Sequence, residues 1–384
     1  MGICLNMIVR NESANLPTLF STLKGHVDFF VIADTGSTDG TPELIEALSK
    51  KYGIPGNVTR HAWTDFATNR NLALQDALNA RMAGEHHCEW VMILDADEEL
   101  RIHHPDWRRK LKPGVTYSAM SKGERLSVNR IFLLWLSGME WTWKGRVHNY
   151  LTAGEIYPYQ HLNDLYIHMH LFRGAKSKPF LTGKSKAAAD ADLMAEELRG
   201  MKPGKPLAHR FFQWAHVLFL SGSIRSAGEI FSALASDPVI GPGIRYASAI
   251  LAGRCCMTTG EGTVEGERWF DLAFSIDPER REALFYIALA TAATDKHKAL
   301  AMLEKASHII APTGAVFYLE HDLYEWRTDH QQILILTAIG DTDRAVEKAR
   351  ELVNRGGIPE TEKGFLWQVL QRGMPPHDPN PERS

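Results

Sequence analysis

The sequence predicts an α/β domain with a mostly parallel sheet, followed by an all-α helical domain. Up to about residue 180, short apolar runs alternate with helix-like stretches. Such strand–helix–strand alternation is typical of a parallel sheet with helices on both faces. From about residue 185 the chain is rich in helix-favouring Ala, Leu, Met and Glu. We place the boundary between the two expected domains, 1–182 and 183–384, at this change of character.

Three apolar runs are the expected strands of the first domain: Ile3–Val9, Phe29–Ala33 and Trp90–Leu94. Each ends in polar residues, several of them acidic. Between the runs, Pro42–Tyr52 and Ala67–Ala83 have the spacing of helices with a buried face. In parallel sheets of this kind, ligands bind beyond the carboxyl ends of the strands. We therefore expect a site where these three runs end.

Prolines mark three units in the helical part, since Pro238, Pro278 and Pro312 each follow a helix-like stretch. Pro278 and Pro312 are 34 residues apart, which is the tetratricopeptide period, whereas Pro238 and Pro278 are 40 apart. The pattern predicts degenerate tetratricopeptide-like repeats, with ordinary helical hairpins as the alternative. Such a domain is expected to offer a concave surface or a homodimer interface.

Composition excludes several classes of protein. The 384 residues carry a formal charge of −3, so a general basic footprint for nucleic acid is absent. The 44% of hydrophobic residues and 23% of charged residues are those of an ordinary globular protein. The four cysteines have no paired spacing, which indicates reduced thiols and a cytoplasmic location. The longest apolar runs are strand-sized, so we expect no transmembrane segment.

An acidic pair follows the third apolar run. Asp95 and Asp97, two residues apart where a strand gives way to a loop, can be held toward one hard cation such as Mn²⁺ or Mg²⁺. A cation of this kind neutralises the charge that develops on a diphosphate leaving group. The D-x-D pattern therefore indicates a metal–nucleotide site, although by itself it also fits solvated loop carboxylates.

The acidic pair belongs to the last of four motifs that follow one another along the chain. They are Asn6–Glu12, Val31–Thr41, Trp63–Leu74 and Leu94–Glu99. This series resembles the family-two glycosyltransferases, which are inverting enzymes with the GT-A fold that use a nucleotide-sugar donor. A weaker likeness continues through Arg130–Phe132 and Gly145–Leu151, to cover about 170 residues. With its repeat-like tail, the chain resembles the subgroup that joins this domain to tetratricopeptide helices.

The resemblance implies a nucleoside site at the ends of the first two strands. Val9, Asn11 and Glu12 lie in the strand–loop that borders the nucleoside in the family. Asp34 matches the aspartate that accepts the uracil N–H, so the implied donor is a UDP-sugar, with glucose as the first guess. An unmatched base would leave that carboxylate unpaired, which makes the contact discriminating.

The resemblance also implies roles around the diphosphate. Asp95 would face the ribose and the metal, and Asp97 would be the direct ligand of Mn²⁺ or Mg²⁺. Arg70 matches the arginine of the family's A-R-N element, and its fork of donors suits a diphosphate. A surface salt bridge is the alternative for Arg70.

Three histidines are candidates for completing the metal site. His168 and His170 alternate, so on a strand both point to one face, and the family often has a histidine near the metal in this region. Either could be the third ligand. His148 is the other candidate, for the metal, the donor phosphate or the acceptor. A structural role is the alternative for each of them.

The catalytic base is the weakest match. Inversion requires a group that takes the proton of the acceptor, and many relatives have a glutamate after the position of His148, where this chain has Asn149. We expect Glu140 to serve instead, in an apolar setting that raises its pKa, with Asp164 as the second candidate. Its neighbours Trp141 and Trp143 would stack on the acceptor or belong to the core.

These patterns together favour a metal-dependent, UDP-sugar-dependent hexosyltransferase. The acceptor is left open among a glycan, a peptide and a hydroxylated DNA base. Two alternatives belong to other classes: a nucleotidyltransferase, and a non-catalytic helical-repeat interaction protein with a degenerate transferase domain.

Overall fold

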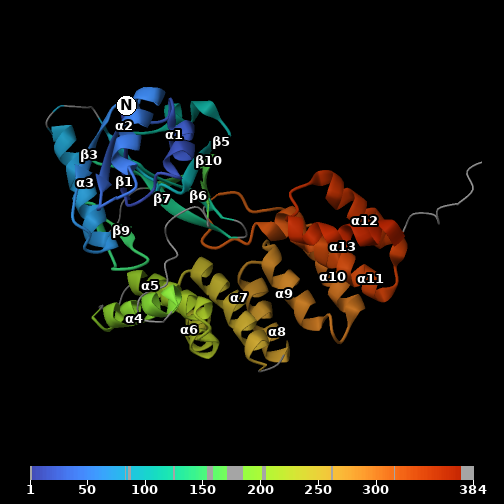
Figure 1. Cartoon of the computed structure of the whole chain (residues 1–384). Helices are drawn as coiled ribbons and strands as arrows, with labels where there is room; N and C mark the ends of the chain where they lie inside the picture. Colours follow the sequence, from blue (N-terminus) through green and yellow to red (C-terminus); the bar gives the residue numbers. More distant parts are fainter. Residues whose placement is uncertain are drawn as a thin grey trace, which may run out of the picture. The chain divides into compact units, whose positions relative to one another are not determined.

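The computed structural model describes residues 2–82, 84, 88–123, 126–153, 159–170, 185–200, 205–260, 263–314 and 316–372. It divides into two compact units (Figure 1). The first unit comprises Met1–Gly222 with Thr313–Leu319, and the second comprises Ser223–Pro312 with Glu320–Ser384. The predicted boundary between residues 182 and 183 lies outside the described residues. The predicted order of an α/β fold followed by helices is confirmed.

The first unit is built on an eight-stranded sheet with the order β3-β2-β1-β4-β7-β6-β10-β5. The neighbours β3, β2, β1 and β4 are parallel, as are β6 and β10, whereas β7 runs antiparallel to β4 and β6, and β5 to β10. A separate pair is formed by β8 and β9. The strands are β1 (Ile3–Val9), β2 (Phe29–Asp34), β3 (Gly56–Arg60), β4 (Trp90–Ile93), β5 (Glu98–Ile102), β6 (Thr116–Lys122), β7 (Ser127–Trp135), β8 (Thr142–Lys144), β9 (Tyr150–Thr152) and β10 (Tyr159–Met169).

Helices cover both faces of the parallel half of the sheet, because successive side chains of a strand point to opposite faces. Leu5 of β1 packs in one buried cluster with Phe20 of α1, whereas its neighbour Cys4 packs in another with Leu74 of α3. This arrangement confirms the expected strands and helices of the first domain. The helices of the unit are α1 (Leu16–Leu23), α2 (Thr41–Tyr52), α3 (Phe66–Met82), the 3-10 helix η1 (Pro105–Lys110), α4 (Lys186–Arg199) and α5 (Lys205–Leu220).

A short segment from much later in the chain, residues 316–319, completes the sheet. Strand β4 pairs with β7 only at Leu133–Trp135, so the first residues of β7 have an open edge. The Ser127 N–H donates to the Leu319 carbonyl at 2.7 Å, and the Leu319 N–H donates back at 3.0 Å. The Asn129 N–H donates to the Val316 carbonyl at 3.1 Å. This segment therefore belongs to the first unit although the residues on either side of it belong to the second.

The second unit is a succession of helices, each packed against the next. Pro238, Pro278 and Pro312 all follow a helix end, as the sequence predicts. Helices α7 and α8 approach closely at Gly253, where an added Cβ would lie 2.4 Å from the Phe270 ring. The elements are α6 (Ile224–Ser236), α7 (Pro242–Thr259), α8 (Thr263–Ile276), α9 (Arg281–Thr291), α10 (Lys296–Ser307), the π-helix η2 (Leu323–Arg327), α11 (Thr328–Ile339), α12 (Thr342–Arg355) and α13 (Glu360–Arg372).

Two further observations bear on the setting of the protein. Among the described residues, no helix combines the length and the apolar character that crossing a membrane requires. The four cysteines are buried. The expected cytoplasmic location and the homodimer stay predictions.

Candidate functional site

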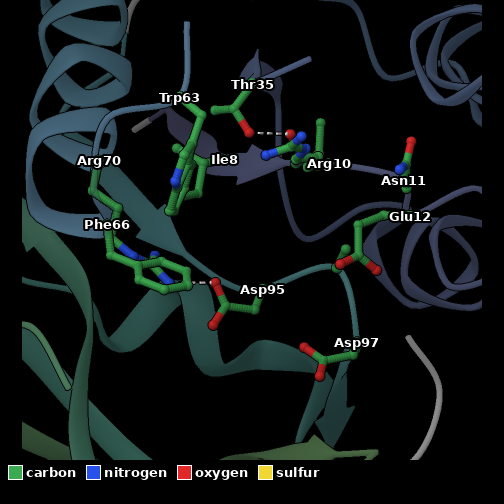
Figure 2. Close-up of a pocket in the computed structure, with 12 residues that line it drawn as sticks. Ile8, Arg10, Asn11, Glu12, Thr35, Trp63, Phe66, Arg70, Asp95 and Asp97 are labelled. Carbon is green, nitrogen blue, oxygen red and sulfur yellow. Dashed lines mark hydrogen bonds and ion pairs between the residues drawn. The ribbon is translucent and has the colours of Figure 1, made fainter. Parts of the chain in front are cut away.

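The order of the parallel strands marks where a ligand should bind. From β1 the chain proceeds outward to β2 and β3 on one side, and then returns to place β4 on the other side of β1. The helical connections therefore diverge at the carboxyl ends of β1 and β4, which is the topological switch point of such a sheet. A hollow of about 450 Å³, the first hollow, lies there. It is lined by Ile8–Glu12, Thr35, Trp63, Phe66, Arg70 and Asp95–Asp97 (Figure 2).

The loop after β1 is held to the loop after β2. The Val9 carbonyl accepts hydrogen bonds from the N–H and the hydroxyl of Thr35, at 2.9 and 3.0 Å. Asn11 has a left-handed φ of 57°, its N–H donates to the Ser37 hydroxyl at 2.9 Å, and its side-chain oxygen accepts from the Thr38 N–H at 2.8 Å. Asn tolerates this conformation better than most residues. The loop that lines the hollow is therefore fixed by its neighbours before any ligand binds.

Glu12 and Asp34 lie in different places relative to the first hollow. Glu12 lines it, and its N–H donates to the Thr41 hydroxyl at 2.9 Å. Asp34, buried at the end of β2, instead accepts from the N–H groups of Gly36 and Ser37 at 3.2 Å and lines a neighbouring hollow. A carboxylate has about four lone-pair sites, so it has capacity for a further donor.

An ion pair forms one wall of the first hollow. The Arg70 guanidinium on α3 donates to the Asp95 carboxylate at 2.6 Å, and its Cζ lies 4.9 Å from the Trp143 ring centroid. The Nε of Arg70 is buried, and no described residue accepts a hydrogen bond from it. Figure 2 shows this pair on the side of the hollow that also holds Phe66. The predicted arginine is therefore inside the site and not in a surface salt bridge.

The turn that carries Asp95 is fixed from behind by a buried carboxylate. Glu98 accepts from the Asp95 N–H at 2.8 Å and pairs with Arg130 at 2.5 Å. Burial raises the pKa of Glu98, and the charge of Arg130 opposes that rise. This support keeps the acidic turn in one conformation.

The structure brings Asp95 and Asp97 to the same hollow but does not assemble the predicted third ligand with them. The His170 N–H donates to the Asp97 carbonyl at 3.0 Å, while the His170 ring contacts the Glu99 carboxylate. His168 packs edge-on against His170, with ring centroids 4.6 Å apart, and burial lowers its pKa. Within the described ranges, no three His, Cys, Asp or Glu side chains gather in a way that could hold a metal ion.

His148 lies in a second hollow, of about 500 Å³, that shares Arg70 and Asp95 with the first. It has a left-handed φ of 44°, and its Nε2 lies 3.6 Å from an Asp190 oxygen. The fully buried Arg210 donates to the His148 carbonyl at 2.7 Å. A strained backbone that is held by a buried group is characteristic of functional sites. The structure thus places His148 apart from Asp97.

Neither predicted catalytic carboxylate lines either hollow. Glu140 is exposed, so the apolar setting that we expected for it is wrong. Asp164 is buried on β10 and pairs with Lys110 of η1, which makes its contacts structural. Of the two tryptophans, Trp141 is a core residue whose indole N–H donates to the Trp135 carbonyl at 2.7 Å, whereas Trp143 lies against Arg70.

Sequence reasoning missed the apolar part of the first hollow. Trp63 and Phe66 line it with their ring centroids 4.9 Å apart, and both are 40% exposed. Both residues lie in the motif that contains Arg70, but a tryptophan and a phenylalanine there read equally well as core. Arg10 is exposed in the same hollow and has no role among the sequence-based predictions. The exposure of such large side chains is the signal, and it requires a structure.

The fold and the site define an α/β domain with polar side chains in a hollow at a topological switch point. Residues 4–114 match the family model of glycosyl transferase family 2. The resemblance of the first domain to family-two glycosyltransferases is therefore confirmed, and the chain carries a domain of this family followed by helices. This match supports glycosyltransferase activity in general.

Two curated relatives each match about a quarter of the chain. Over 99 residues, or 26% of the chain, it is 34% identical to a TPR repeat-containing protein of Synechococcus elongatus, and the match covers 21% of that protein. Over 94 residues, or 24% of the chain, it is 27% identical to an uncharacterized glycosyltransferase of Rickettsia felis, of which 28% is covered. The chain thus matches only about a fifth to a quarter of the length of these relatives.

Among solved structures, the chain is similar to MamA of Desulfovibrio magneticus RS-1, with a TM-score of 0.34, 13% identity, and coverage of 44% of this chain and 85% of that one. It is also similar to a kinesin light chain of Podosopora anserina with nearly identical TPR-like repeats, with a TM-score of 0.34, 14% identity, and coverage of 48% and 88%.

Proposed function

We propose that the first hollow binds a UDP-sugar together with Mn²⁺ or Mg²⁺, and that the first unit transfers the sugar, with inversion, to an acceptor hydroxyl. The observation that carries this proposal is the composition of the hollow at the switch point. Its wall combines a carboxylate, Asp97, with the guanidinium of Arg70 and the exposed rings of Trp63 and Phe66. These are the partners that a metal ion, a diphosphate and a nucleobase require.

The nucleotide is held by two kinds of contact. Trp63 and Phe66 offer aromatic surface to the base, because every base has a face that stacks on an aromatic ring. The uridine preference rests on the spare acceptor capacity of Asp34, which lies one loop away from Asn11. Arg70 and Arg10 supply charge for the diphosphate. The Arg70 Nε is buried, and no residue in the described part of the chain accepts a hydrogen bond from it, so it is one donor that a phosphate oxygen would satisfy.

The residues present fit a divalent cation of the kind that takes only part of its ligands from protein. Mg²⁺ is usually held by one or two carboxylates and completes its coordination with water and phosphate oxygens. Asp97 would hold it, with Asp95 nearby but engaged by Arg70. The absence of a described cluster of three ligands is consistent with such a site. When bound, the cation would neutralise the leaving diphosphate.

We assign to His148 the role of the base that takes the proton from the acceptor hydroxyl. His148 lines the second hollow, where Asp190 is positioned to orient the imidazole and to stabilise its protonated form. We expect His148→Gln to lower the rate of sugar transfer about 100-fold or more while UDP binding stays within twofold. A normal rate in this variant would remove His148 from the proposal.

The proposed donor site is tested by calorimetric titration of UDP, GDP, ADP and CDP, with and without Mn²⁺. We expect metal-dependent binding of UDP that Asp97→Ala weakens about 100-fold, because the cation loses its protein carboxylate. The matched control is Asp106→Ala, an exposed aspartate of the same unit that should bind UDP like the wild type. Donor turnover should release UDP, whereas a nucleotidyltransferase would release inorganic diphosphate.

Failure to bind any nucleotide would contradict the proposal. The function would then have to be sought in the helical unit, as expected of an interaction protein with a degenerate transferase domain.

A further inference from the structure

The second hollow is placed where an acceptor must enter, if the proposed function holds. It meets the first hollow at Arg70 and Asp95, which line both. The anomeric carbon of a nucleotide-sugar is bonded to the diphosphate, so an acceptor hydroxyl has to approach beside the group that binds the diphosphate. A volume of about 500 Å³ is within the range of ligand pockets.

One wall of the second hollow is a cluster of aromatic rings. Phe212 of α5 lies with its ring centroid 4.9 Å from that of Phe317 and 6.2 Å from that of Tyr318. The His209 ring lies 5.6 Å from Phe317, and Trp143 lines the same hollow. Aromatic rings in this number offer a surface to the C–H face of a sugar ring as well as to another aromatic group. The wall therefore indicates a ligand that contains a ring.

Three neutral amides are among the polar groups of the hollow. Asn129, Asn149 and Gln213 line it. The side-chain nitrogen of Asn149 is buried, and no described residue accepts a hydrogen bond from it. A buried donor without a partner is unfavourable, so a ligand oxygen that accepts a hydrogen bond from it is bound more tightly. Asn149 is thus suited to hold an acceptor hydroxyl.

Among the described residues that line the hollow, each of the two arginines is paired with a carboxylate. Arg70 pairs with Asp95, and Arg130 pairs with Glu98. Burial lowers the pKa of His209, which keeps its imidazole neutral near pH 7. A nucleic acid acceptor needs unpaired Lys or Arg side chains for its phosphates. The hollow therefore favours an uncharged ligand.

We propose that the second hollow binds a neutral sugar ring of the acceptor, so that the acceptor is a glycan. Phe317 and Tyr318 belong to the segment that pairs with the open edge of β7, and they are required to complete this site. The sugar ring lies against the aromatic wall, and Asn149 and Gln213 bond its hydroxyl groups. This inference rests on the proposed function only in naming the bound sugar an acceptor.

Saturation-transfer difference NMR on the full chain, saturated with UDP and diamagnetic Mg²⁺, tests the proposal. The probes are methyl glycosides of glucose, galactose, mannose and N-acetylglucosamine in both anomeric forms, N-acetyltyrosine amide, and a short single-stranded oligonucleotide. We expect at least one methyl glycoside to bind, and Phe317→Ala and Asn149→Ala each to weaken that binding about tenfold. Phe317→Leu keeps the apolar volume and should lose most of the same affinity. The control Leu220→Ala changes an exposed residue of α5 and should bind like the wild type.

The outcomes separate this inference from the proposed function. Glycoside binding that the two alanine variants weaken, with UDP affinity unchanged, supports the site. UDP binding without binding of any glycoside overturns the sugar site and leaves the donor site intact. Preferential binding of the tyrosine amide or of the oligonucleotide also overturns it, in favour of a peptide or a nucleic acid. Glycoside binding without UDP binding supports the sugar site and contradicts the donor site.

Discussion

Each unit of this protein contains an arginine–carboxylate pair stacked on an aromatic ring, and the two pairs differ in what surrounds them. In the first unit, Arg70 pairs with Asp95 at 2.6 Å, over Trp143. In the second, Arg280 pairs with Glu282 at 2.5 Å, and its Cζ lies 4.0 Å from the Tyr246 ring centroid.

The pair in the second unit is closed off from solvent. The Arg280 and Glu282 side chains are 4% and 0% exposed, and Glu282 also accepts from the hydroxyl groups of Tyr246 and Tyr324 and from the Glu320 N–H, at 3.1–3.3 Å. Burial, together with the charge of Glu282, raises the pKa values of Tyr246 and Tyr324, so both phenols stay protonated and donate. Such a saturated network holds helices together and has no capacity for a ligand.

The pair in the first unit is unsaturated. Asp95 is 32% exposed, both residues line two hollows, and the Arg70 Nε has no described partner. The same kind of ion pair therefore has its bonding capacity filled in the second unit and only partly filled in the first.

The largest expected effect concerns the buried pair of Arg280 and Glu282. Glu282→Ala should lower the free energy of unfolding of the helical unit by about 3–5 kcal/mol, because Arg280 is left buried without its partner. Denaturant unfolding followed by circular dichroism measures this change. Glu282→Gln keeps the volume and should cost less. A loss below about 1 kcal/mol in the alanine variant would show that the network is not what stabilises these helices.

A change in the Arg70–Asp95 pair should affect activity and leave stability nearly unchanged. Arg70→Lys keeps the charge but loses the fork of donors, so kcat/KM for donor turnover should fall about 30–100-fold, or about 2–3 kcal/mol. The melting temperature of the Arg70→Lys variant should stay close to that of the wild type. Equal activity of the wild type and Arg70→Lys would mean that Arg70 acts only through its charge. Unfolding of the variant would mean that the Arg70–Asp95 pair is structural.

A smaller effect is expected at the rings of the first hollow. Trp63→Ala and Phe66→Ala should each raise the Kd for UDP about tenfold, which is typical of losing one stacking contact with a base. The titration used for the donor site measures it. Trp367→Ala, which removes an exposed tryptophan of α13, is the matched control. If both ring variants bind UDP normally, the base lies elsewhere, and the contact with Asp34 becomes the only one to examine.

The smallest effect concerns an exposed carboxylate outside both pairs. Burial tends to raise the pKa of Asp39, but hydrogen bonds from Thr41 and Ser13 outweigh it and lower the pKa to about 2. Because this folded-state pKa is lower than the usual 3.8, the stabilisation is present above pH 3.8 and is lost as the pH falls toward about 2.

Asp39→Ala should therefore cost at most about 1 kcal/mol near neutral pH, since the group is largely exposed, and less at about pH 3. Thermal unfolding of the wild type and the variant at both pH values measures the difference. A stability difference between the wild type and Asp39→Ala that grows as the pH falls would contradict the lowered pKa of Asp39.

The features that the sequence predicts well are local or follow from strand direction. β1, β2, β4, α2 and α3 appear where apolar runs and helical spacing place them. Val9, Asn11, Glu12, Arg70, Asp95 and Asp97 all line the first hollow, because the carboxyl ends of parallel strands meet at one edge of a sheet.

The features that it predicts poorly depend on contacts between distant residues. The location of Asp164 is decided by its pairing with Lys110, and the exposure of Glu140 by a turn before β8. His148 is held by Arg210, which lies 62 positions later. No spacing within a motif reports such contacts. For the same reason, Phe317 and Tyr318 could not be connected to a site near Trp143.

The pairing of residues 316–319 with β7 also constrains how this protein can be divided. The chain passes between its two units three times, after Gly222, after Pro312 and after Leu319. A fragment that ends after α5 would expose the edge of β7 at Ser127–Asn129, and unpaired strand edges promote association with other chains. The first unit is therefore incomplete in any fragment that lacks residues 316–319.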